Sequence, residues 1–313
     1  GSYFSAYNYG DYGVYAFFAV DGVLDHSYAS GSPDAGFYIG QCYPCDAIVN
    51  NVISENNGLG YSGTNSGGSL YIISSVFKNN KGGLAPNTLD SELLPPERET
   101  FIIGNLIENN NNIDAPATQS TNLSLGNGVV IAGGNNNIIK NNVIANHNLY
   151  GVIITATADV NYWPAHGNRV ESNLIINSKR ADIASSGLSN LGNCFENNYF
   201  NTSIPPGLQT LNNCDSSFYP LSADLSGMWS SLARVIQTSD GNYNQGDWRT
   251  FEAPANQPNM PIMDELMSLG YDKTSLPVTK IWSSVKPAVE VFSQYEDVLE
   301  VIELPEEARN YLN

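Results

Sequence analysis

Basic residues are scarce in this chain, which has 13 Lys and Arg against 31 Asp and Glu and a formal net charge of −18. Proteins bind nucleic acids and anionic membrane surfaces with Lys and Arg side chains that neutralise phosphates. The sequence therefore predicts no nucleic-acid partner. No apolar run approaches the roughly 18 residues that a membrane helix needs, so no membrane span is predicted in this chain.

Charge of either sign is also limited, because only 14% of the residues are Asp, Glu, Lys or Arg. The polarity comes instead from Asn, Ser, Thr and Gly, and Asn and Gly tolerate the left-handed backbone of tight turns. This composition favours many short strands over helices. No secretory signal is visible, and the first residues, GSYFSAYNYG, already resemble the interior of a fold. We expect upstream sequence, including any export signal, to be missing or to have been processed away; GS also fits the remnant of a tag.

Cysteines are few, and their number is even: Cys42, Cys45, Cys194 and Cys214. In an acidic, Asn-rich chain this suits an exported protein with two disulfides, which proximity pairs as Cys42–Cys45 and Cys194–Cys214. The alternative is metal or redox use of the Cys-x-x-Cys pair. A structural zinc site needs four nitrogen or sulfur ligands, and neither a second such pair nor the context of a redox motif is present. We expect disulfides, no metal, and an extracellular or cell-surface location.

Internal repetition is the strongest feature that is present. Seven segments align so that their equivalent residues follow one another at steps of 24, 24, 30, 37, 31 and 25 residues. A base period of about 24 residues, with insertions in three turns, explains these steps. The equivalent residues are Tyr28, Val52, Val76, Leu106, Val143, Leu174 and Tyr199.

A short strand that begins with Gly accompanies each repeat, as in GVYAF at Gly13 and GVIIT at Gly151. Such strands cannot bury their apolar faces alone, but they can when coils stack about 4.8 Å apart in a parallel β-helix. One polar column would then form a corner ladder, in which stacked Asn side chains hydrogen-bond from coil to coil. Its members are Ser27, Asn51, Ser75, Asn105, Asn142, Asn173 and Asn198.

The N-N-x-[IV]-x-x-N pattern, with its Gly-led strands, resembles the PbH1 repeats of right-handed parallel β-helix proteins in the pectin-lyase-like group. The resemblance covers roughly residues 10 to 215. HSYASGSPDAGFYIGQCYPC and GYSGTNSGG are similar to exported bacterial β-helix proteins whose function is uncharacterised. The resemblance implies an all-β, right-handed parallel β-helix. It implies no single activity, because this fold hosts lyases, hydrolases, epimerases, adhesins and inert surface proteins.

The repeat stops near Tyr219, so we expect a β-helix over residues 1–218 and an acidic C-terminal cap or arm over 219–313. A cap is expected because the last coil of a β-helix leaves open edges that need covering. The alternative is an acidic tail that is partly disordered, mainly beyond Leu304.

Alternation sorts the faces of the strands. In the Gly-led strands it places Tyr15, Tyr38, Ser62, Ala85, Val130 and Ile153 on the outside. In the strands that follow, it places outside Asp25, Val49, Ile73, Ile103, Lys140, Glu171 and Glu196. Val49, Ile73 and Ile103 then form an exposed apolar strip, and a patch of this kind usually has a partner. We expect the C-terminal arm or a second protein molecule to cover it.

Three insertions flank the Gly-led strands, at residues 87–100, 111–126 and 155–168. Insertions in solenoids tend to collect on the functional side, so these predict a walled groove over the Gly-led strands. The expected ligand contacts are Tyr15, Tyr38, Gln41, Asn65, Asn87, Tyr162 and Trp163. Trp163 equally fits a role in pinning its own loop.

No catalytic constellation is visible. A glycosidase needs two carboxyl groups, yet the outward positions of the Gly-led strands contain none. A lyase needs a base and neutralisation of the uronate charge, and the acidic clusters of pectate lyases and polygalacturonases are not reproduced. Weak candidates are Asp34, His26, Asp90, Arg98 and His166. Their structural alternatives are a turn cap for Asp34, a turn donor for His26, and a solvated Glu97–Arg98 pair.

No cofactor is predicted. Ca²⁺ binding by the acidic loops stays open, although Asp90 and Glu92 alone fall short of the six to eight oxygen ligands that Ca²⁺ prefers. Two functions remain. One is an exported or cell-surface protein that binds, and in one version processes, a polysaccharide in the groove, where negative charge favours neutral or cationic glycans over uronates. The other is a non-catalytic structural or assembly protein that docks through the apolar strip and the C-terminal arm.

Overall fold

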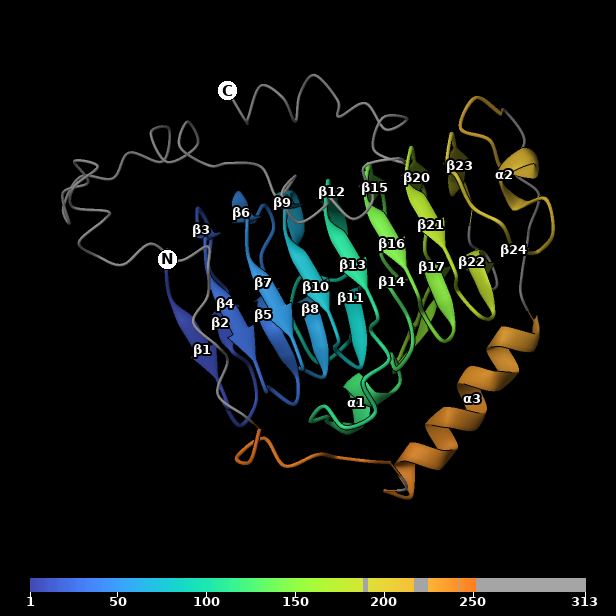
Figure 1. Ribbon diagram of the computed structural model, residues 1–313. Coiled ribbons are helices and arrows are strands. Elements are labelled where there is room, and N and C mark those ends of the chain that lie inside the picture. The colour runs from blue at the N-terminus through green and yellow to red at the C-terminus, as the bar shows by residue number, and fades with distance from the viewer. Residues whose placement is uncertain (188–190, 217–224, 242, 252–313) are drawn as a thin grey trace.

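Three parallel sheets stack around one apolar interior in the computed structural model, which describes residues 1–187, 191–216, 225–241 and 243–251. Nearly every coil contributes one short strand to each sheet, and the coils follow one another in chain order from the N-terminal end (Figure 1). The chain is therefore an all-β parallel β-helix, as its repeat predicts.

The three sheets are numbered here I, II and III. Sheet I contains β1 (Ser5–Tyr7), β4 (Tyr28–Ser30), β7 (Ile53–Glu55), β10 (Val76–Lys78), β13 (Leu106–Glu108), β16 (Val143–Ala145) and β21 (Leu174–Ile176). Sheet II contains β2 (Val14–Phe17), β5 (Ala35–Gly40), β8 (Leu59–Thr64), β11 (Gly82–Asn87), β14 (Val129–Ala132), β17 (Tyr150–Thr155), β22 (Ala181–Ser186) and β24 (Ser203–Ile204). Sheet III contains β3 (Val23–Asp25), β6 (Ala47–Asn50), β9 (Gly67–Ile73), β12 (Arg98–Ile103), β15 (Ile138–Lys140), β20 (Arg169–Glu171) and β23 (Cys194–Glu196).

The remaining elements lie outside the stacked coils. A small antiparallel hairpin pairs β18 (Thr157–Ala158) with β19 (Tyr162–Trp163). The helices are α1 (Gln119–Asn122), α2 (Leu208–Leu211) and α3 (Leu225–Ser239). No described helix is long and apolar enough to cross a membrane.

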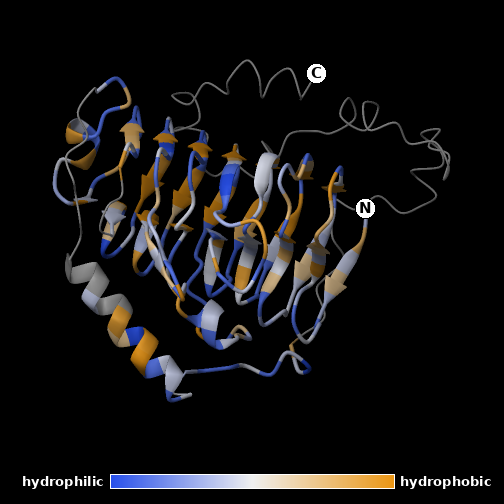
Figure 2. Cartoon of the chain, turned by 180° about the vertical axis from the view of Figure 1, so that it is seen from behind, coloured by the Kyte–Doolittle hydropathy of each residue, from blue (hydrophilic) through white to orange (hydrophobic). Residues whose placement is uncertain are grey.

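Alternation along sheet II agrees with the predicted faces. The inward column is fully buried from the second coil onward and forms part of the main core; it contains Phe37, Tyr61, Leu84, Val129 and Val152. Tyr15 pairs with Tyr38, and Tyr38 pairs with Ser62, on the outer side. Apolar residues run along the strands throughout the stack (Figure 2). The sheet therefore separates a continuous apolar interior from an outer face of mixed character.

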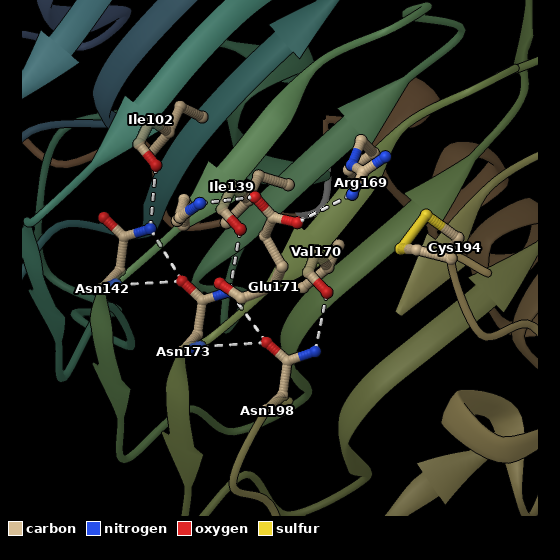
Figure 3. Close-up of polar contacts among 11 residues, drawn as sticks. Ile102, Ile139, Asn142, Arg169, Val170, Glu171, Asn173, Cys194 and Asn198 are labelled. Carbon is tan, nitrogen blue, oxygen red and sulfur yellow. Dashed lines mark hydrogen bonds and ion pairs between the residues drawn. A yellow bond between two sulfur atoms is a disulfide. The ribbon is translucent and has the colours of Figure 1, made fainter. Parts of the chain in front are cut away.

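Polar ladders line the corners between the sheets. In the predicted ladder, the Asn142 side chain accepts from the backbone and the amide of Asn105 at 2.9 and 3.0 Å. It donates to Asn173, and Asn173 donates in turn to Asn198, both at 2.9 Å (Figure 3). Two further ladders were not predicted. They run through Asn57, Asn80 and Asn110 at a second corner, and through Asn137, Asn168 and Asn193 at a third. Each ladder gives buried backbone and amide groups the partners that burial requires.

One coil departs from the predicted register. Tyr28 pairs with Ile53 rather than with Val52, so Val52 occupies the ladder position that had been predicted for Asn51. Asn51 instead takes the left-handed turn position just before the ladder, with φ of 50°. The consequence reaches the neighbouring strand, where Asn50 rather than Val49 is the equivalent of Asp25.

The predicted apolar strip is accordingly wrong at one of its three members. Val49 is fully buried in the core, whereas Ile73 and Ile103 lie partly exposed on sheet III as expected. Beside them, the rings of Tyr71 and Phe101 stack with centroids 4.8 Å apart. The outer face of sheet III is thus partly apolar, but through a different set of side chains.

Both disulfides form as predicted, Cys42–Cys45 and Cys194–Cys214, and no described cysteine is free. This removes the metal and redox alternatives for the Cys-x-x-Cys pair. The Cys194–Cys214 bond lies at the end of the solenoid beside α2, and Leu208 of α2 is fully buried in the core there. Leu208 therefore closes the C-terminal end of the apolar interior.

The described part of the C-terminal arm does not lie over sheet III. Helix α3 contacts α1 and β22, and residues 243–251 then run past the 111–126 insertion to the first coil (Figure 1). The predicted boundary at 218/219 and the predicted tail beyond Leu304 lie outside the described residues.

Candidate aromatic and acidic site

The first insertion folds back over sheet II and covers most of the predicted groove floor. The Asn65 side chain donates to the carbonyl oxygens of Leu89 and Glu92 at 2.7 and 2.8 Å. The Gln41 side-chain oxygen accepts from the Leu93 amide at 2.8 Å. Gln41 and Asn65 were predicted to contact a ligand; in the structure these amide groups hold the protein's own loop.

Outward residues beneath this loop are almost inaccessible, with Ser62 5% and Thr64 4% exposed. Thr64 donates to the side-chain oxygen of Asn87 at 3.0 Å, and the Asn87 amide donates to the Ala85 carbonyl at 2.8 Å. Asn87 is thus also held by neighbouring residues. The predicted floor is therefore open to solvent mainly at its N-terminal end.

The second insertion, residues 111–126, docks on the corner that precedes sheet II. Thr121 and the Thr118 amide both donate to the carbonyl oxygen of Pro33, at 2.9 and 3.1 Å. The buried Lys81 ammonium donates to the Ile113 carbonyl at 2.7 Å. Burial lowers the pKa of Lys81 to about 8, with Asp114 opposing the shift. The Lys81 side chain and the Pro33 carbonyl of the coils thus fix this insertion in place.

The third insertion, residues 155–168, is tied to the first. Asp90 accepts hydrogen bonds from the backbone and the side chain of Asn161 at 2.8 and 2.6 Å, and these bonds lower the pKa of Asp90. The Cβ and backbone oxygen of Trp163 lie beside Gly133, and its partly buried side chain helps to lower the pKa of Asp90, which favours the loop-pinning alternative. Tyr162 is 46% exposed on the same hairpin. Asp90 therefore links the first and third insertions, which is a structural role.

Four aromatic rings gather where the groove floor stays open. We call Tyr12, Tyr15, Phe17 and Tyr38 the tyrosine platform. Tyr15 lies at its centre, with its ring centroid 4.6 Å from Tyr12, 4.8 Å from Tyr38 and 5.5 Å from Phe17. The Tyr15 and Phe17 rings are nearly parallel, at 7°, and are 52% and 39% exposed. Tyr38, only 1% exposed, supports the platform from beneath.

Three carboxyl groups surround the platform. The Tyr38 hydroxyl donates to Glu92 at 2.6 Å, and the second oxygen of Glu92 is buried without a hydrogen-bond partner. Burial raises the pKa of Glu92, and the bond from Tyr38 opposes this shift. Burial raises the pKa of Asp34 to about 7; repulsion from Asp11 and Glu92 adds to the rise, while a hydrogen bond from Tyr12 opposes it. The site therefore combines apolar ring faces with acidic groups that repel one another.

The other catalytic candidates lie apart from the platform. His26 stacks on Tyr3 and lies 3.2 Å from an oxygen of Asp25, in a left-handed turn with φ of 45°. Arg98 lies over the ring of Tyr43, 3.6 Å from its centroid. His166 accepts a hydrogen bond from the Leu191 amide at 3.1 Å. Of the five candidates, only Asp34 lies beside the platform.

The expected solvated Glu97–Arg98 pair is wrong. Glu97 is fully buried at the corner that precedes sheet III, where Thr100 and Asn137 each donate to its carboxyl group at 2.8 Å. Burial raises the pKa of Glu97 to about 8. A charged residue next to Arg98 in an insertion is expected to be solvated when only the sequence is considered. Its burial follows from the folding of the coil around it, which the sequence does not show.

Among the described residues, no group of three or more Asp, Glu, His or Cys side chains is arranged to hold a metal ion. Asp90 and Glu92 face different partners, Asn161 and Tyr38.

Sequence reasoning missed Tyr12, Phe17 and Asp11, and it considered Glu92 only among the acidic residues of its insertion, without a link to the platform. A detectable signal was the aromatic density of YNYGDYGVYAFF, residues 7–18. The contribution of Glu92 could not be seen, because this residue follows Tyr38 by 54 positions.

Comparison with known proteins adds little beyond the fold. No family model matches the chain, and no curated protein does. Among solved structures, the chain is similar to the A-module of mannuronan C-5 epimerase AlgE4 from Azotobacter vinelandii, with a TM-score of 0.39 and 16% identity. That alignment covers 64% of this chain and 55% of that module, so the chain spans about half of its length. At this TM-score the likeness carries no information on substrate, and the β-helix follows from the strand pairing described above.

Proposed function

We propose that this protein is an exported glycan-binding protein whose site is the tyrosine platform. The observation that carries the proposal is the exposed, nearly parallel pair Tyr15 and Phe17 beside Asp34 and Glu92. Flat aromatic faces bind the apolar faces of sugar rings, and carboxyl groups bind their hydroxyls. Two disulfides support an oxidising, extracellular location.

The charge of the site sets the class of glycan. Burial raises the pKa of Asp11, Asp34 and Glu92, and the negative charges of Asp11 and Glu92 raise the pKa of Asp34 further. A uronate would add a further negative charge to the site and would be repelled by it. A neutral sugar would meet no such repulsion, and an amine-bearing sugar would be attracted. We infer a neutral or amine-bearing chain. Within the site, Asp34 is the group suited to proton transfer, because a pKa of about 7 lies near neutral pH.

Replacing the exposed ring tests the proposal. Tyr15→Ala is expected to weaken binding of a neutral or amine-bearing oligosaccharide about tenfold or more, because an aromatic contact contributes roughly 1.5 kcal/mol. Tyr15→Phe keeps the ring and should bind nearly as the wild type. Calorimetric titration with chitin, chitosan, β-glucan and polygalacturonate oligosaccharides measures this.

Tyr199→Ala is the matched control, because Tyr199 is 64% exposed and follows the last strand of sheet III, away from the platform. Equal affinities for Tyr15→Ala and wild type, or tightest binding to polygalacturonate, would contradict the proposal.

A second candidate function is protein docking through α3. This helix contacts the 111–126 insertion through Arg234, which donates to the carbonyl oxygens of Leu123 and Leu125 at 3.3 Å. Its apolar residues Trp229 and Ile236 are instead 71% and 58% exposed. Apolar colour on α3 is visible in Figure 2. An apolar helix face turned to solvent usually has a partner.

Light scattering after gel filtration separates this function from a monomeric glycan binder. If α3 joins two copies, the wild type elutes as a dimer and Trp229→Glu as a monomer. A wild type that stays monomeric at high concentration would rule out self-assembly through this helix.

A further inference from the structure

The groove floor continues past the tyrosine platform beneath the first insertion. Tyr38 pairs with Ser62 of the next strand, and Thr64, on the same outer face of that strand, pairs with Asn87 of the strand after it. Neighbouring parallel strands lie about 4.8 Å apart, so these polar side chains begin where the aromatic rings end. We call residues 89–94, which fold over them, the lid. Under the lid, the floor changes from aromatic rings to hydroxyl and amide groups.

Two buried amide side chains of the floor are occupied by the backbone of the lid. Gln41 and Asn65 follow adjacent strands in equivalent left-handed positions, with φ of 51° and 46°. The Asn65 side chain donates to the carbonyl oxygens of Leu89 and Glu92 and accepts from the Leu89 amide at 3.2 Å. The Gln41 oxygen accepts from the Leu93 amide. Sugar hydroxyls both donate and accept hydrogen bonds, so they can replace the lid backbone at each of these groups.

The closed lid carries three costs. Its apolar side chains Leu93 and Leu94 are 64% and 41% exposed. Leu94 has a φ of 67°, in the left-handed region that a Leu side chain rarely adopts. One carboxyl oxygen of Glu92 is buried without a hydrogen-bond partner in the described part of the chain, which is unfavourable. Opening relieves these costs, and they oppose the hydrogen bonds that hold the lid closed.

The outer end of the lid is fastened by exposed hydrogen bonds to the third insertion. The Asp90 amide donates to Asp159 at 2.8 Å, and the Asp90 carboxylate accepts from the backbone and the side chain of Asn161. Water competes with exposed hydrogen bonds, so their net contribution is small. The lid can therefore separate from the third insertion without breaking any contact of the core.

We propose that the lid opens as a unit and that an oligosaccharide longer than the platform displaces it, so that the groups beneath it form a second, hydroxyl- and amide-lined glycan subsite. Glu92 contacts both Tyr38 of the platform and Asn65 of the floor. A chain that extends from the platform onto the floor must therefore displace Glu92, whereas a short sugar on the platform need not. The identity of the ligand rests on the proposed function, but the opening of the lid does not. The subsite consists of Gln41, Ser62, Thr64 and Asn65.

Thiol labelling tests the opening without any ligand. Ser62→Cys places a thiol beneath the lid, where Ser62 is only 5% exposed, and no described native cysteine is free. Val129→Cys, in the core of the same sheet, reacts only when the protein unfolds. The Ser62→Cys thiol should react with Ellman's reagent about 100-fold faster than the Val129→Cys thiol, because local opening costs less than global unfolding. Adding Asn65→Asp, which cannot donate to the lid carbonyls, should speed the reaction about tenfold more.

Three labelling results overturn the lid. A Ser62→Cys rate equal to that of Val129→Cys would show no opening short of unfolding. A rate equal to that of Asn148→Cys, at an exposed turn, would show that the floor is never covered. An unchanged rate with Asn65→Asp would show that these hydrogen bonds do not hold the lid.

Calorimetry with oligosaccharides of two lengths tests the subsite. Asp90→Ala loosens the lid without changing the platform or the floor, and Asp240→Ala, at an exposed site beyond α3, is the matched control. Asp90→Ala should bind the hexamers of the chitin, chitosan or β-glucan series about threefold or more tighter than wild type, because less free energy is spent on opening. Binding of the dimers should not change.

The outcomes separate the subsite from the proposed function. Equal hexamer affinities for Asp90→Ala and wild type would overturn the subsite and leave the platform as the glycan site. A matching gain for the dimers would also overturn it, because a dimer does not reach beneath the lid. Binding of none of these oligosaccharides would refute the proposed function and the subsite together, while the labelling rates would still decide whether the lid opens.

Discussion

Replacing Asn142 with Ala is expected to lower the free energy of unfolding by about 4 kcal/mol, which is a large effect for one side chain. Its amide donates to the Ile102 carbonyl and to Asn173, and its oxygen accepts from the backbone and side chain of Asn105, all at 2.9–3.0 Å. Asn142 is fully buried, so water cannot replace it. Truncation leaves several buried groups unpaired, each costing about 1–3 kcal/mol without strict additivity.

Urea unfolding followed by circular dichroism measures this loss. Asn148→Ala is the matched control, because Asn148 is exposed in the turn of the same coil, and its effect should stay within about 0.5 kcal/mol. A loss of less than about 1 kcal/mol for Asn142→Ala would show that the ladder contributes little to stability.

Glu97→Gln is expected to make the protein more stable at alkaline pH. Burial raises the pKa of Glu97 to about 8 from an ordinary value of 4.5, so the folded protein holds a proton that the unfolded chain has lost between these pH values. The stability that this proton contributes is complete below about pH 4.5 and is lost as pH rises to about 8. Gln keeps both contacts when its oxygen accepts from the Asn137 amide and its NH2 group donates to the Thr100 hydroxyl, and it has no proton to lose. The variant should match wild type near pH 5 and exceed it at pH 9 by at most about 5 kcal/mol.

The quantity to compare is the free energy of unfolding of Glu97→Gln minus that of the wild type at each pH, because Asp34 and His147 also titrate. Burial raises the pKa of Asp34 to about 7 and lowers that of His147 to about 4, and both contributions cancel when wild type is subtracted. Glu108→Gln, on the outer side of β13, serves as the control and should parallel wild type. A difference between Glu97→Gln and wild type that is constant from pH 5 to pH 9 would contradict the buried, protonated carboxyl.

The repeat could be predicted because stacking imposes the same demands on every coil. A residue with left-handed backbone precedes each ladder position, and alternation along each strand separates core from surface residues. Both features therefore recur in the sequence with the period of the coils. The register error at Val52 has a local cause. The stretch VNNV offers two adjacent Asn residues, and either one fits the turn when only spacing is considered. Backbone pairing of Tyr28 with Ile53 decides between them.

The candidate site was less predictable, because its contacts join residues far apart in the chain. Tyr15 was expected to be exposed, and it is. Tyr38 was also expected at the surface, but Glu92 and the neighbouring rings cover it. Insertions follow no period, so the sequence shows that they exist but not over which residues they fold.

The sequence by itself determined the parallel β-helix, its inward and outward columns outside the one misregistered coil, and its two disulfides, because each arises from a repeated or short-range pattern. Only the tertiary structure decided which outward residues stay exposed, that Glu97 is buried, and that the described arm runs to the first coil. These properties depend on where irregular segments pack, and packing between distant segments leaves no periodic signal in the chain.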